Sequence, residues 1–188
     1  MRWEERLLDL FDDLEQQAEG LHLAERDAEL VDRSRAEYSH VTLAARLHAS
    51  LGAPVNLDVL GVGAVHGDLV RVGLDWCLVR STPATGEWIV RFSALKKARG
   101  LSERAVNQEA RSVLARLTFG AVLRGVAEST YPAVIHHVDG SQTRARLARV
   151  GADFVESWAA SQEEGPGRAR RAVAEVTPFS SIAAVRPA

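Results

Sequence analysis

Hydrophobic residues along the chain follow two different periods, and the change between them divides the sequence. Up to residue 49 the apolar positions recur at alternating steps of four and three, which predicts helix. After Pro54 the period becomes two, and Val55, Leu57 and Val59 alternate with polar residues, as in a half-buried strand. The sequence therefore predicts a helical N-terminal segment followed by a mainly β region.

The N-terminal segment is predicted as helix over 2–19 and 21–49, with Gly20 as the natural break, because glycine costs about 1 kcal/mol in a helix interior. Two interpretations remain open: a long helix pairs with a second copy as a coiled coil, or two shorter helices fold back within the chain. Pairing is favoured, because a long apolar seam must be covered. We therefore expect a homo-oligomer, with a dimer favoured, whose seam residues are Trp3, Leu7, Leu10, Phe11 and Leu14.

A short phrase occurs twice in the β region. Arg71–Trp76 returns as Arg149–Phe154, offset by 78 residues (72 to 150), and Phe92–Leu95 returns as Phe179–Ile182, offset by 87 (92 to 179). The chain thus contains two copies of one unit, and the second copy has nine extra residues between its two matching blocks. We expect these extra residues in the loop 159–168.

Each copy is predicted to contain five short strands, and a further helix is predicted from Ser102 to about Ala127. Five short strands must curl and close on themselves to bury a core. The expected fold class is α+β, mainly β with helices: a long N-terminal helical segment, then two five-stranded SH3-like barrels, each preceded by a helix. The expected domains are 1–50, 51–100, 101–128 and 129–188. The expected strands are 55–59, 64–72, 75–80, 87–92 and 95–99, then 133–138, 141–150, 153–158, 172–177 and 182–186.

This order of a helix and then a barrel resembles the Sm-like small β-barrel superfamily, in particular tandem two-barrel proteins of high-GC bacteria. Val138-Asp139-Gly140, Gly67-Asp68-Leu69 and the repeated Phe-Ser-x-(Leu/Ile) step before the last strand carry the resemblance, which covers 41–99 and 110–186. It implies the barrel fold. RNA-binding members of that superfamily place an asparagine four residues after the aspartate of the third strand, where this chain has Val79 and Ser157.

A second departure from those members lies in the turn before the last strand. They carry Arg-Gly or Lys-His there, whereas this chain has Ser93-Ala94 and Ser180-Ser181. The resemblance therefore implies the fold without the nucleotide pocket, and fold does not carry function across.

Charge and composition narrow the class of protein. The net charge of −2 argues against the diffuse basic footprint of a nonspecific nucleic-acid binder, and residues 1–50 alone hold twelve acidic residues and six arginines. No signal-peptide block and no apolar stretch of membrane-spanning length is visible, so we expect a cytoplasmic protein without a membrane partner. Cys77 is the single cysteine, which excludes an intrachain disulfide, and its apolar strand pattern predicts a core position.

No catalytic, cofactor or metal site is predicted. Gly61-x-Gly63 superficially matches a dinucleotide fingerprint, but the residues that follow have the pattern of a strand, whereas the fingerprint needs a helix. His136 and His137 are neighbours in a strand and point to opposite faces, so they cannot bind one metal together. No serine lies in a nucleophile elbow. The chain is therefore interpreted as a non-enzyme.

Two groups of residues are candidates for a role beyond the core. The repeated turn contains Gly73, Asp75, Gly151 and Asp153, and we interpret its carboxylates as acceptors of backbone N–H groups. An arginine-rich group in the second copy is the best candidate for anion or nucleic-acid contact, although nearby glutamates favour a solvated rim of mixed charge. Its members are Arg144, Arg146, Arg149, Arg168, Arg170 and Arg171.

Two functions follow as hypotheses. The favoured one is a non-enzymatic scaffold, adaptor or regulatory interaction protein that binds a protein partner. The alternative is an RNA- or DNA-binding regulator that uses the arginine-rich side of the second barrel, since phosphate contacts alone support salt-sensitive binding.

Overall fold

The computed structural model contains the whole chain and describes residues 16, 19–20, 22, 26, 29, 33, 35–81, 86–106, 113–129, 131–159 and 174–188. The chain divides into two compact units, Met1–Val41 and Thr42–Ala188. Among the described residues, no helix has both the length and the apolar character that crossing a membrane requires.

In the first unit the described residues from 16 to 39 are helical, and a turn follows at His40. The prediction of a long helical segment reaching residue 50, with a break at Gly20, is wrong: Gly20 is helical and the interruption lies at 40–42. The reason is a new helix start at Thr42, whose extended backbone and side-chain cap oppose a continuous helix. The predicted seam from Trp3 to Leu14 lies outside the described residues.

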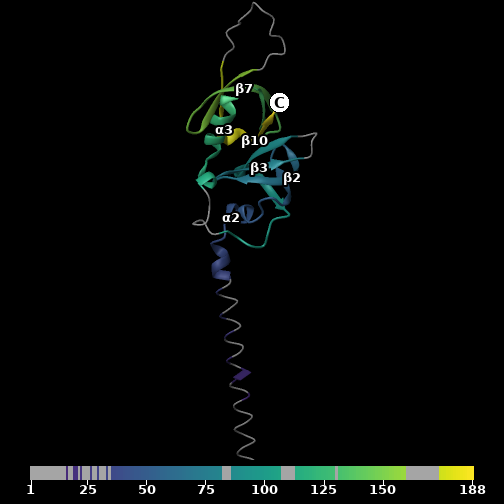
Figure 1. Ribbon diagram of the computed structural model, residues 1–188, viewed down its shortest axis with the longest axis vertical. Helices are drawn as coiled ribbons and strands as arrows, with labels where there is room; N and C mark the ends of the chain where they lie inside the picture. The colour runs from purple at the N-terminus through teal and green to yellow at the C-terminus, as the bar shows by residue number, and fades with distance from the viewer. Residues whose placement is uncertain are drawn as a thin grey trace, which may run out of the picture. The chain divides into compact units, whose positions relative to one another are not determined.

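In the second unit ten strands form one antiparallel sheet in the order β5-β1-β2-β3-β4-β10-β6-β7-β8-β9. Figure 1 labels β2, β3, β7 and β10 of this sheet. All ten strands expected from the alternating pattern are confirmed, each within a few residues of its expected ends. Their bounds are β1 Pro54–Val59, β2 Gly63–Val72, β3 Trp76–Arg80, β4 Glu87–Arg91, β5 Leu95–Arg99, β6 Ala133–His137, β7 Gln142–Val150, β8 Phe154–Ala159, β9 Glu175–Pro178 and β10 Ile182–Pro187.

The prediction of two separate five-stranded barrels is wrong, because a single sheet runs through both repeats. β4 of the first repeat pairs with β10 of the second, at Ile89 with Val185 and at Val90 with Ala184. An edge strand carries unpaired N–H and C=O groups, and pairing two edges satisfies them. The two repeats therefore join edge to edge, and β5 and β9 remain as the outer strands of the sheet.

The strand pairing repeats with the offsets found in the sequence. The orders β5-β1-β2-β3-β4 and β10-β6-β7-β8-β9 are equivalent, and the irregularities recur at equivalent places. One register shift lies between Leu69 and Arg71 in β2, and its counterpart lies between Leu147 and Arg149 in β7. The nine extra residues fall between β8 and β9, so the duplication holds at the level of individual residue pairs.

Each repeat begins with a short helix on its own second strand: α2 (Leu43–His48) packs on β2 and α3 (Phe119–Glu128) packs on β7 (Figure 1). The N-cap hydroxyls of Thr42 and Thr118 accept hydrogen bonds from the N–H groups three residues later, at 3.2 and 3.3 Å. The prediction of one helix over 102–127 is wrong, because Thr118 is extended and a separate 3₁₀ turn, Val113–Arg116, precedes α3.

Two hydrophobic cores hold the second unit together, and each takes residues from both repeats. The core of the first repeat centres on Leu57, Leu69 and Val79 and includes Ala183 and Ala184 of β10. The core of the second repeat gathers around Leu123, Ile135 and Val155 and includes Trp76 of β3. Because each repeat completes the core of the other, the two repeats form one folding unit.

Candidate binding site

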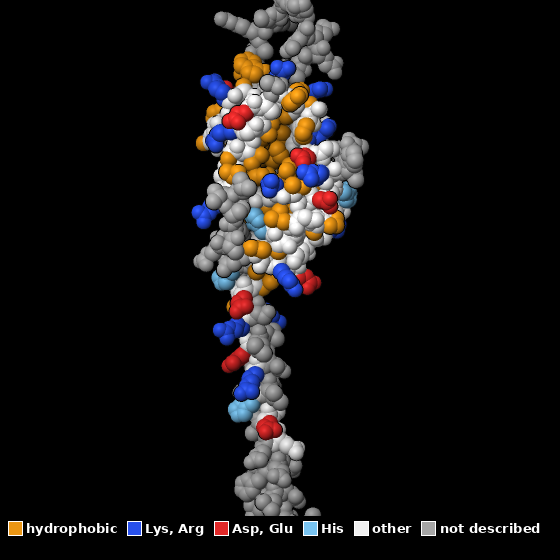
Figure 2. Space-filling model, in the orientation of Figure 1, with side chains coloured by type: hydrophobic (Ala, Val, Ile, Leu, Met, Phe, Trp, Pro, Cys, Tyr) orange, Lys and Arg blue, Asp and Glu red, His pale blue; other side chains and the backbone are white. Residues whose placement is uncertain are grey.

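An apolar groove of about 480 Å³ lies between α3 and the middle of the sheet. Its floor is made by Leu78 of β3, Ile89 of β4 and Val185 of β10, and Val122 and Val126 of α3 form one wall. Figure 2 shows hydrophobic side chains gathered in a hollow on the face where Figure 1 draws α3 and β10. The junction between β4 and β10 runs through the floor, so the groove exists only because the repeats are joined.

The first repeat fixes the start of α3. The Phe119 N–H donates to Asp75 Oδ1 at 2.7 Å, and Trp76 Nε1 donates to the Leu117 carbonyl at 2.9 Å. A carboxylate in this position also interacts favourably with the positive end of the helix dipole. The Phe119 ring is fully buried and packs edge-on against Phe179, with 5.4 Å between the ring centroids. These contacts set the position of the groove wall.

Gly125 leaves part of that wall without a side chain. No heavy atom lies within 4 Å of the position that a Cβ on Gly125 would take. Helical spacing places Val122, Gly125 and Val126 on one face of α3, and all of them line the groove. A larger side chain at this position would therefore occupy the groove without meeting the backbone.

The polar groups at the margin of the groove are bonded to one another or exposed. Glu87 Oε1 accepts hydrogen bonds from Arg80 Nε at 3.0 Å and Nη2 at 2.9 Å. The Ser129 hydroxyl donates to the Val126 carbonyl at 2.6 Å, and the Tyr131 side chain is 78% exposed. Among the described lining residues, no nucleophile is bonded to a base. The groove therefore offers apolar contact, with an exposed aromatic residue at its rim.

A second cluster lies where β4, β10 and β6 are adjacent. Arg186 Nε donates to His136 Nε2 at 3.3 Å, and the Arg186 guanidinium lies 5.5 Å from the centre of the Trp88 ring. His136 is 4% exposed. Burial lowers the pKa of His136, and the charges of Arg186 and His137 lower this pKa further. The imidazole is therefore kept neutral, as accepting a hydrogen bond from Arg186 requires.

The remaining candidate groups in the described part of the chain are a buried thiol and possible metal ligands. Cys77 is a free cysteine in the core, and burial raises the pKa of its thiol to about 12, so it is an inert thiol. In the part of the chain that the structure describes, no three His, Cys, Asp or Glu side chains gather as metal ligands would.

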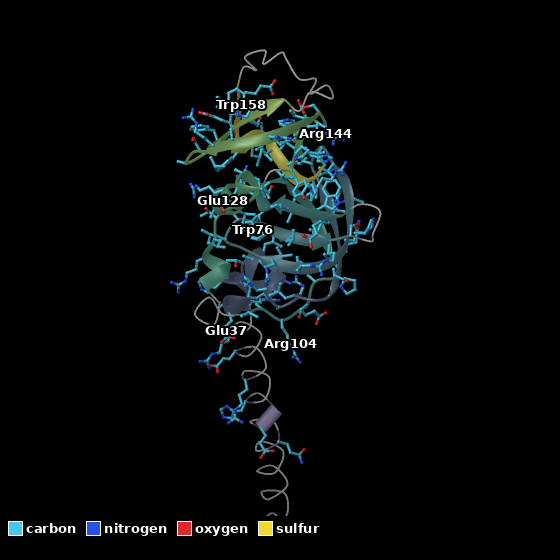
Figure 3. The ribbon with its side chains drawn as sticks, turned by 45° about the horizontal axis from the view of Figure 1, so that its top comes forward. Glu37, Trp76, Arg104, Glu128, Arg144 and Trp158 are labelled. Carbon is cyan, nitrogen blue, oxygen red and sulfur yellow. The ribbon has the colours of Figure 1, made fainter. Side chains whose placement is uncertain are left out.

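Three of the predicted arginines lie together on the outward face of β7. Arg144, Arg146 and Arg149 are all exposed, because the bulge in β7 keeps Arg149 on the same side. Arg149 is ion-paired with Glu156 at 2.7 Å, whereas Arg146 lies opposite Trp158, which is 42% exposed. Figure 3 labels Arg144 and Trp158 on these strands. The other three predicted residues, Arg168, Arg170 and Arg171, lie outside the described residues.

The repeated turn places a glycine beneath an aromatic ring. A Cβ on Gly73 would lie 2.1 Å from the Trp76 side chain, and a Cβ on Gly151 would lie 2.4 Å from that of Phe154. Each glycine N–H donates to the carbonyl of its aromatic residue, at 2.8 and 2.9 Å. The glycine in each copy is therefore required by the ring that follows three residues later.

The two aspartates of this turn have different surroundings. The Asp75 carboxylate accepts a backbone N–H from the start of α3, not from its own turn. Among the described residues, no hydrogen bond or ion pair involves the Asp153 carboxylate, although the Asp153 carbonyl accepts from Phe179 N–H at 2.7 Å. The two copies thus share the backbone conformation of the turn. They differ in the carboxylate, which accepts the N–H of a helix start in the first copy and has no such partner among the described residues in the second.

The groove was not predicted from the sequence. One signal was present in β3, where Trp76–Val79 is apolar at four successive positions. A strand with apolar residues on both faces is covered on both faces, which indicates a further layer over this part of the sheet. The position of that layer required the contact between α3 and the first repeat.

Comparison with protein-family models, with curated proteins and with solved structures found no match to this chain. The resemblance to Sm-like proteins therefore stays a prediction, and the site is interpreted from its own geometry.

Proposed function

We propose that this chain is a non-enzymatic interaction protein whose apolar groove binds a segment of a protein partner. The observation that carries the proposal is the groove of about 480 Å³, floored by Leu78, Ile89 and Val185. Binding sites commonly have volumes of about 300–1,000 Å³ and a mainly apolar lining. Removing apolar surface from water yields about 25 cal/mol per Å², which is the driving force for an apolar segment to enter.

The form of the groove favours a protein segment over a free small molecule. Small ligands are usually enclosed over about 70–90% of their surface. Its apolar side chains are visible at the surface (Figure 2), so the groove is open to solvent and an occupying segment can continue beyond it. The exposed Tyr131 at the rim is of a residue type that is enriched in protein interfaces.

The test uses a displayed library of random peptides selected on the full chain alone, and the selected peptides are then assayed on the wild-type chain and on Gly125→Leu. The added leucine fills the groove, and helical geometry accepts it because Gly125 has open space around its Cβ position. The matched control is Glu128→Leu, which adds the same side chain at an exposed position of α3 that is labelled in Figure 3 and does not line the groove.

We expect the selected peptides to carry apolar residues, to bind the wild-type chain and Glu128→Leu equally, and to bind Gly125→Leu at least about tenfold more weakly. Amide shifts of Val122 and Val126 in NMR titrations should follow the binding. If the enriched peptides bind Gly125→Leu as well as wild type, the groove is not their site and the proposal is wrong.

A second candidate function is binding of single-stranded nucleic acid on the outward face of β7 and β8. The observation that favours it is the cross-strand pair of Arg146 with the exposed Trp158, because an aromatic ring beside a cation suits base stacking and phosphate contact. Against it, the neighbouring Arg149 is already neutralised by Glu156.

Fluorescence anisotropy with single-stranded RNA and DNA at two salt concentrations tests this candidate. Stacking on Trp158 predicts that Trp158→Ala weakens binding by about 1–3 kcal/mol at both salt concentrations. Arg146→Ala should instead reduce the salt dependence. Binding that neither substitution alters would exclude this face as the site.

A further inference from the structure

The sheet of the second unit ends in two different strands, and the pairing inside the chain relates them. Within the chain, β4 of the first repeat pairs with β10, the last strand of the second repeat. By the offset of 87 residues, β9 is the counterpart of β4 and β10 is the counterpart of β5. The outer strands β9 and β5 are therefore the counterparts of β4 and β10, the two strands that pair with each other within the chain.

We infer that a second copy of this chain docks on the β9 edge through its β5, and repeats between molecules the junction that β4 and β10 make within one. Each copy then has one β5 edge and one β9 edge to offer. An exposed edge strand gains backbone hydrogen bonds when it pairs, which makes such a contact favourable.

The residue pairing of this contact follows from the internal junction. The pair Ile89–Val185 corresponds to Val176 of one copy and Ala98 of the next. Val176 is 60% exposed, so it has apolar surface that a partner strand can cover. Pairing with Ala98 would bury part of it, as Ile89 beside Val185 is half-buried inside the chain.

The next position along the two strands carries opposite charges. Inside the chain this position holds Trp88 and Arg186, with the guanidinium over the ring. The corresponding residues at the free edges are Glu175 on β9 and Arg99 on β5, both exposed. Neither side chain has an ion pair among the described residues. Lys97 adds a further positive charge to β5, so the two edges attract each other and each repels its own kind.

The start of the helix provides a second, independent correspondence. Inside the chain the Asp75 carboxylate accepts the N–H of Phe119, which directly follows the N-cap of α3. The counterpart of Asp75 is the exposed Asp153, and the residue that directly follows the N-cap of α2 is Leu43, which is 43% exposed. In the contact between copies, Asp153 would receive the helix start of the next molecule.

One difference makes the contact between copies weaker than the internal junction. Arg91 of β4 donates to the Phe179 carbonyl and lies 5.3 Å from the centre of the Phe119 ring. Its counterpart on β9 is Pro178, which has neither a guanidinium nor a backbone donor. The association is therefore reversible and depends on concentration.

The contact joins unlike surfaces, so it is heterologous. A heterologous contact repeats from copy to copy and closes into a ring or continues as a filament. A ring and a filament would contain the same contact between Glu175 and Arg99. Substitutions of these two residues therefore test either assembly.

The experiment is sedimentation velocity on the full chain, with the single variants Arg99→Glu and Glu175→Arg and an equimolar mixture of the two. In each variant alone the contact joins like charges, so we expect assembly to weaken at least about tenfold relative to wild type. In the mixture, the β5 of Arg99→Glu meets the β9 of Glu175→Arg with opposite charges. The mixture should regain assembly, which misfolded variants cannot do.

Two results would overturn the inference. One is a wild-type chain that stays monomeric up to about 100 µM. The other is assembly that neither charge reversal weakens, or that the mixture fails to regain, which would place the contact elsewhere, for example at the seam Trp3–Leu14. Gly125→Leu, which fills the groove, should assemble as wild type does. This control separates the inference from the proposed function of the groove.

Discussion

The two repeats share one backbone plan, yet the outer faces of their third and fourth strands differ. In the first repeat this face is covered by α3, and β3 is apolar on both sides from Trp76 to Val79. In the second repeat the corresponding strand alternates: Val155 is buried, whereas the outward position that corresponds to Leu78 holds the charged Glu156. The comparison teaches that the residues on the outer face of a strand depend on whether a helix packs over that face. The fold of the repeat alone does not determine them.

The aromatic residues of the repeated turn show the same dependence on neighbours. Trp76 is buried and its indole N–H donates to the Leu117 carbonyl, because the segment before α3 lies across the turn. Phe154 occupies the equivalent position in the second repeat and is half-buried. A buried tryptophan needs a hydrogen-bond partner for its N–H. The tryptophan therefore occurs in the repeat where the segment before α3 provides that partner.

The largest expected difference between the repeats concerns the two turn glycines. Gly73→Ala should cost about 3 kcal/mol of the free energy of unfolding, because the new methyl meets a Trp76 ring that its hydrogen bond holds in place. Gly151→Ala should cost about 1 kcal/mol, because the half-buried Phe154 ring can turn toward solvent. Urea unfolding of both variants measures the two costs, and equal costs would contradict the comparison.

The next effect concerns the two aspartates. Asp75→Ala should cost about 1–2 kcal/mol, since it leaves the Phe119 N–H at the start of α3 without its acceptor. Asp153→Ala should change the free energy of unfolding by less than about 0.5 kcal/mol at protein concentrations too low for association. Unfolding curves at low concentration decide this, and a large cost for Asp153→Ala would show a contact within the single chain.

The sequence was sufficient for the strands and for the duplication. Apolar patterning and the internal repeat together located all ten strands, and the offsets of 78 and 87 residues correspond to the pairing in the structure. Local features of this kind depend on residues close in sequence. The junction of β4 with β10 is different, because which edge pairs with which depends on the whole assembly of the sheet.

The candidate site was less accessible to sequence reasoning for the same physical reason. The groove needs Ile89 and Val185 side by side, and these residues are far apart in the chain. The helix over 102–127 was predicted as continuous because its apolar spacing carries no sign of the extended Thr118. For the arginines, charge alone did not indicate that Arg149 is paired with Glu156.

A smaller and stabilising effect comes from making α3 more like α2. The N-caps Thr42 and Thr118 align Gly125 with Ala49 and Gly120 with Ala44. Gly125→Ala should raise the free energy of unfolding by about 0.5–1 kcal/mol, because open space surrounds the added methyl and alanine favours helix.

Gly120→Ala is the matched comparison on the same helix, because its Cβ would lie 3.2 Å from the Phe179 ring. The helix-propensity gain is the same, so any shortfall relative to Gly125→Ala measures the crowding. Thermal unfolding of the two variants gives the difference. If Gly120→Ala stabilises as much as Gly125→Ala, the ring moves away freely and the comparison fails.

The smallest expected effect is a dependence of stability on pH that arises at His136 of the second repeat. His136 corresponds to Asp58 of the first repeat, which pairs with Lys96 at 3.7 Å. Burial, followed by the charges of Arg186 and His137, lowers the pKa of His136 below its ordinary value of 6.5. Below pH 6.5 the unfolded chain therefore binds more protons than the folded chain at this group, so the free energy of unfolding falls as the pH falls. Well above the unfolded-state value, from about pH 8, the group is neutral in both states and contributes no slope. Urea unfolding on either side of the unfolded-state value, for wild type and His136→Gln, isolates the effect, and equal slopes for the two chains would exclude it.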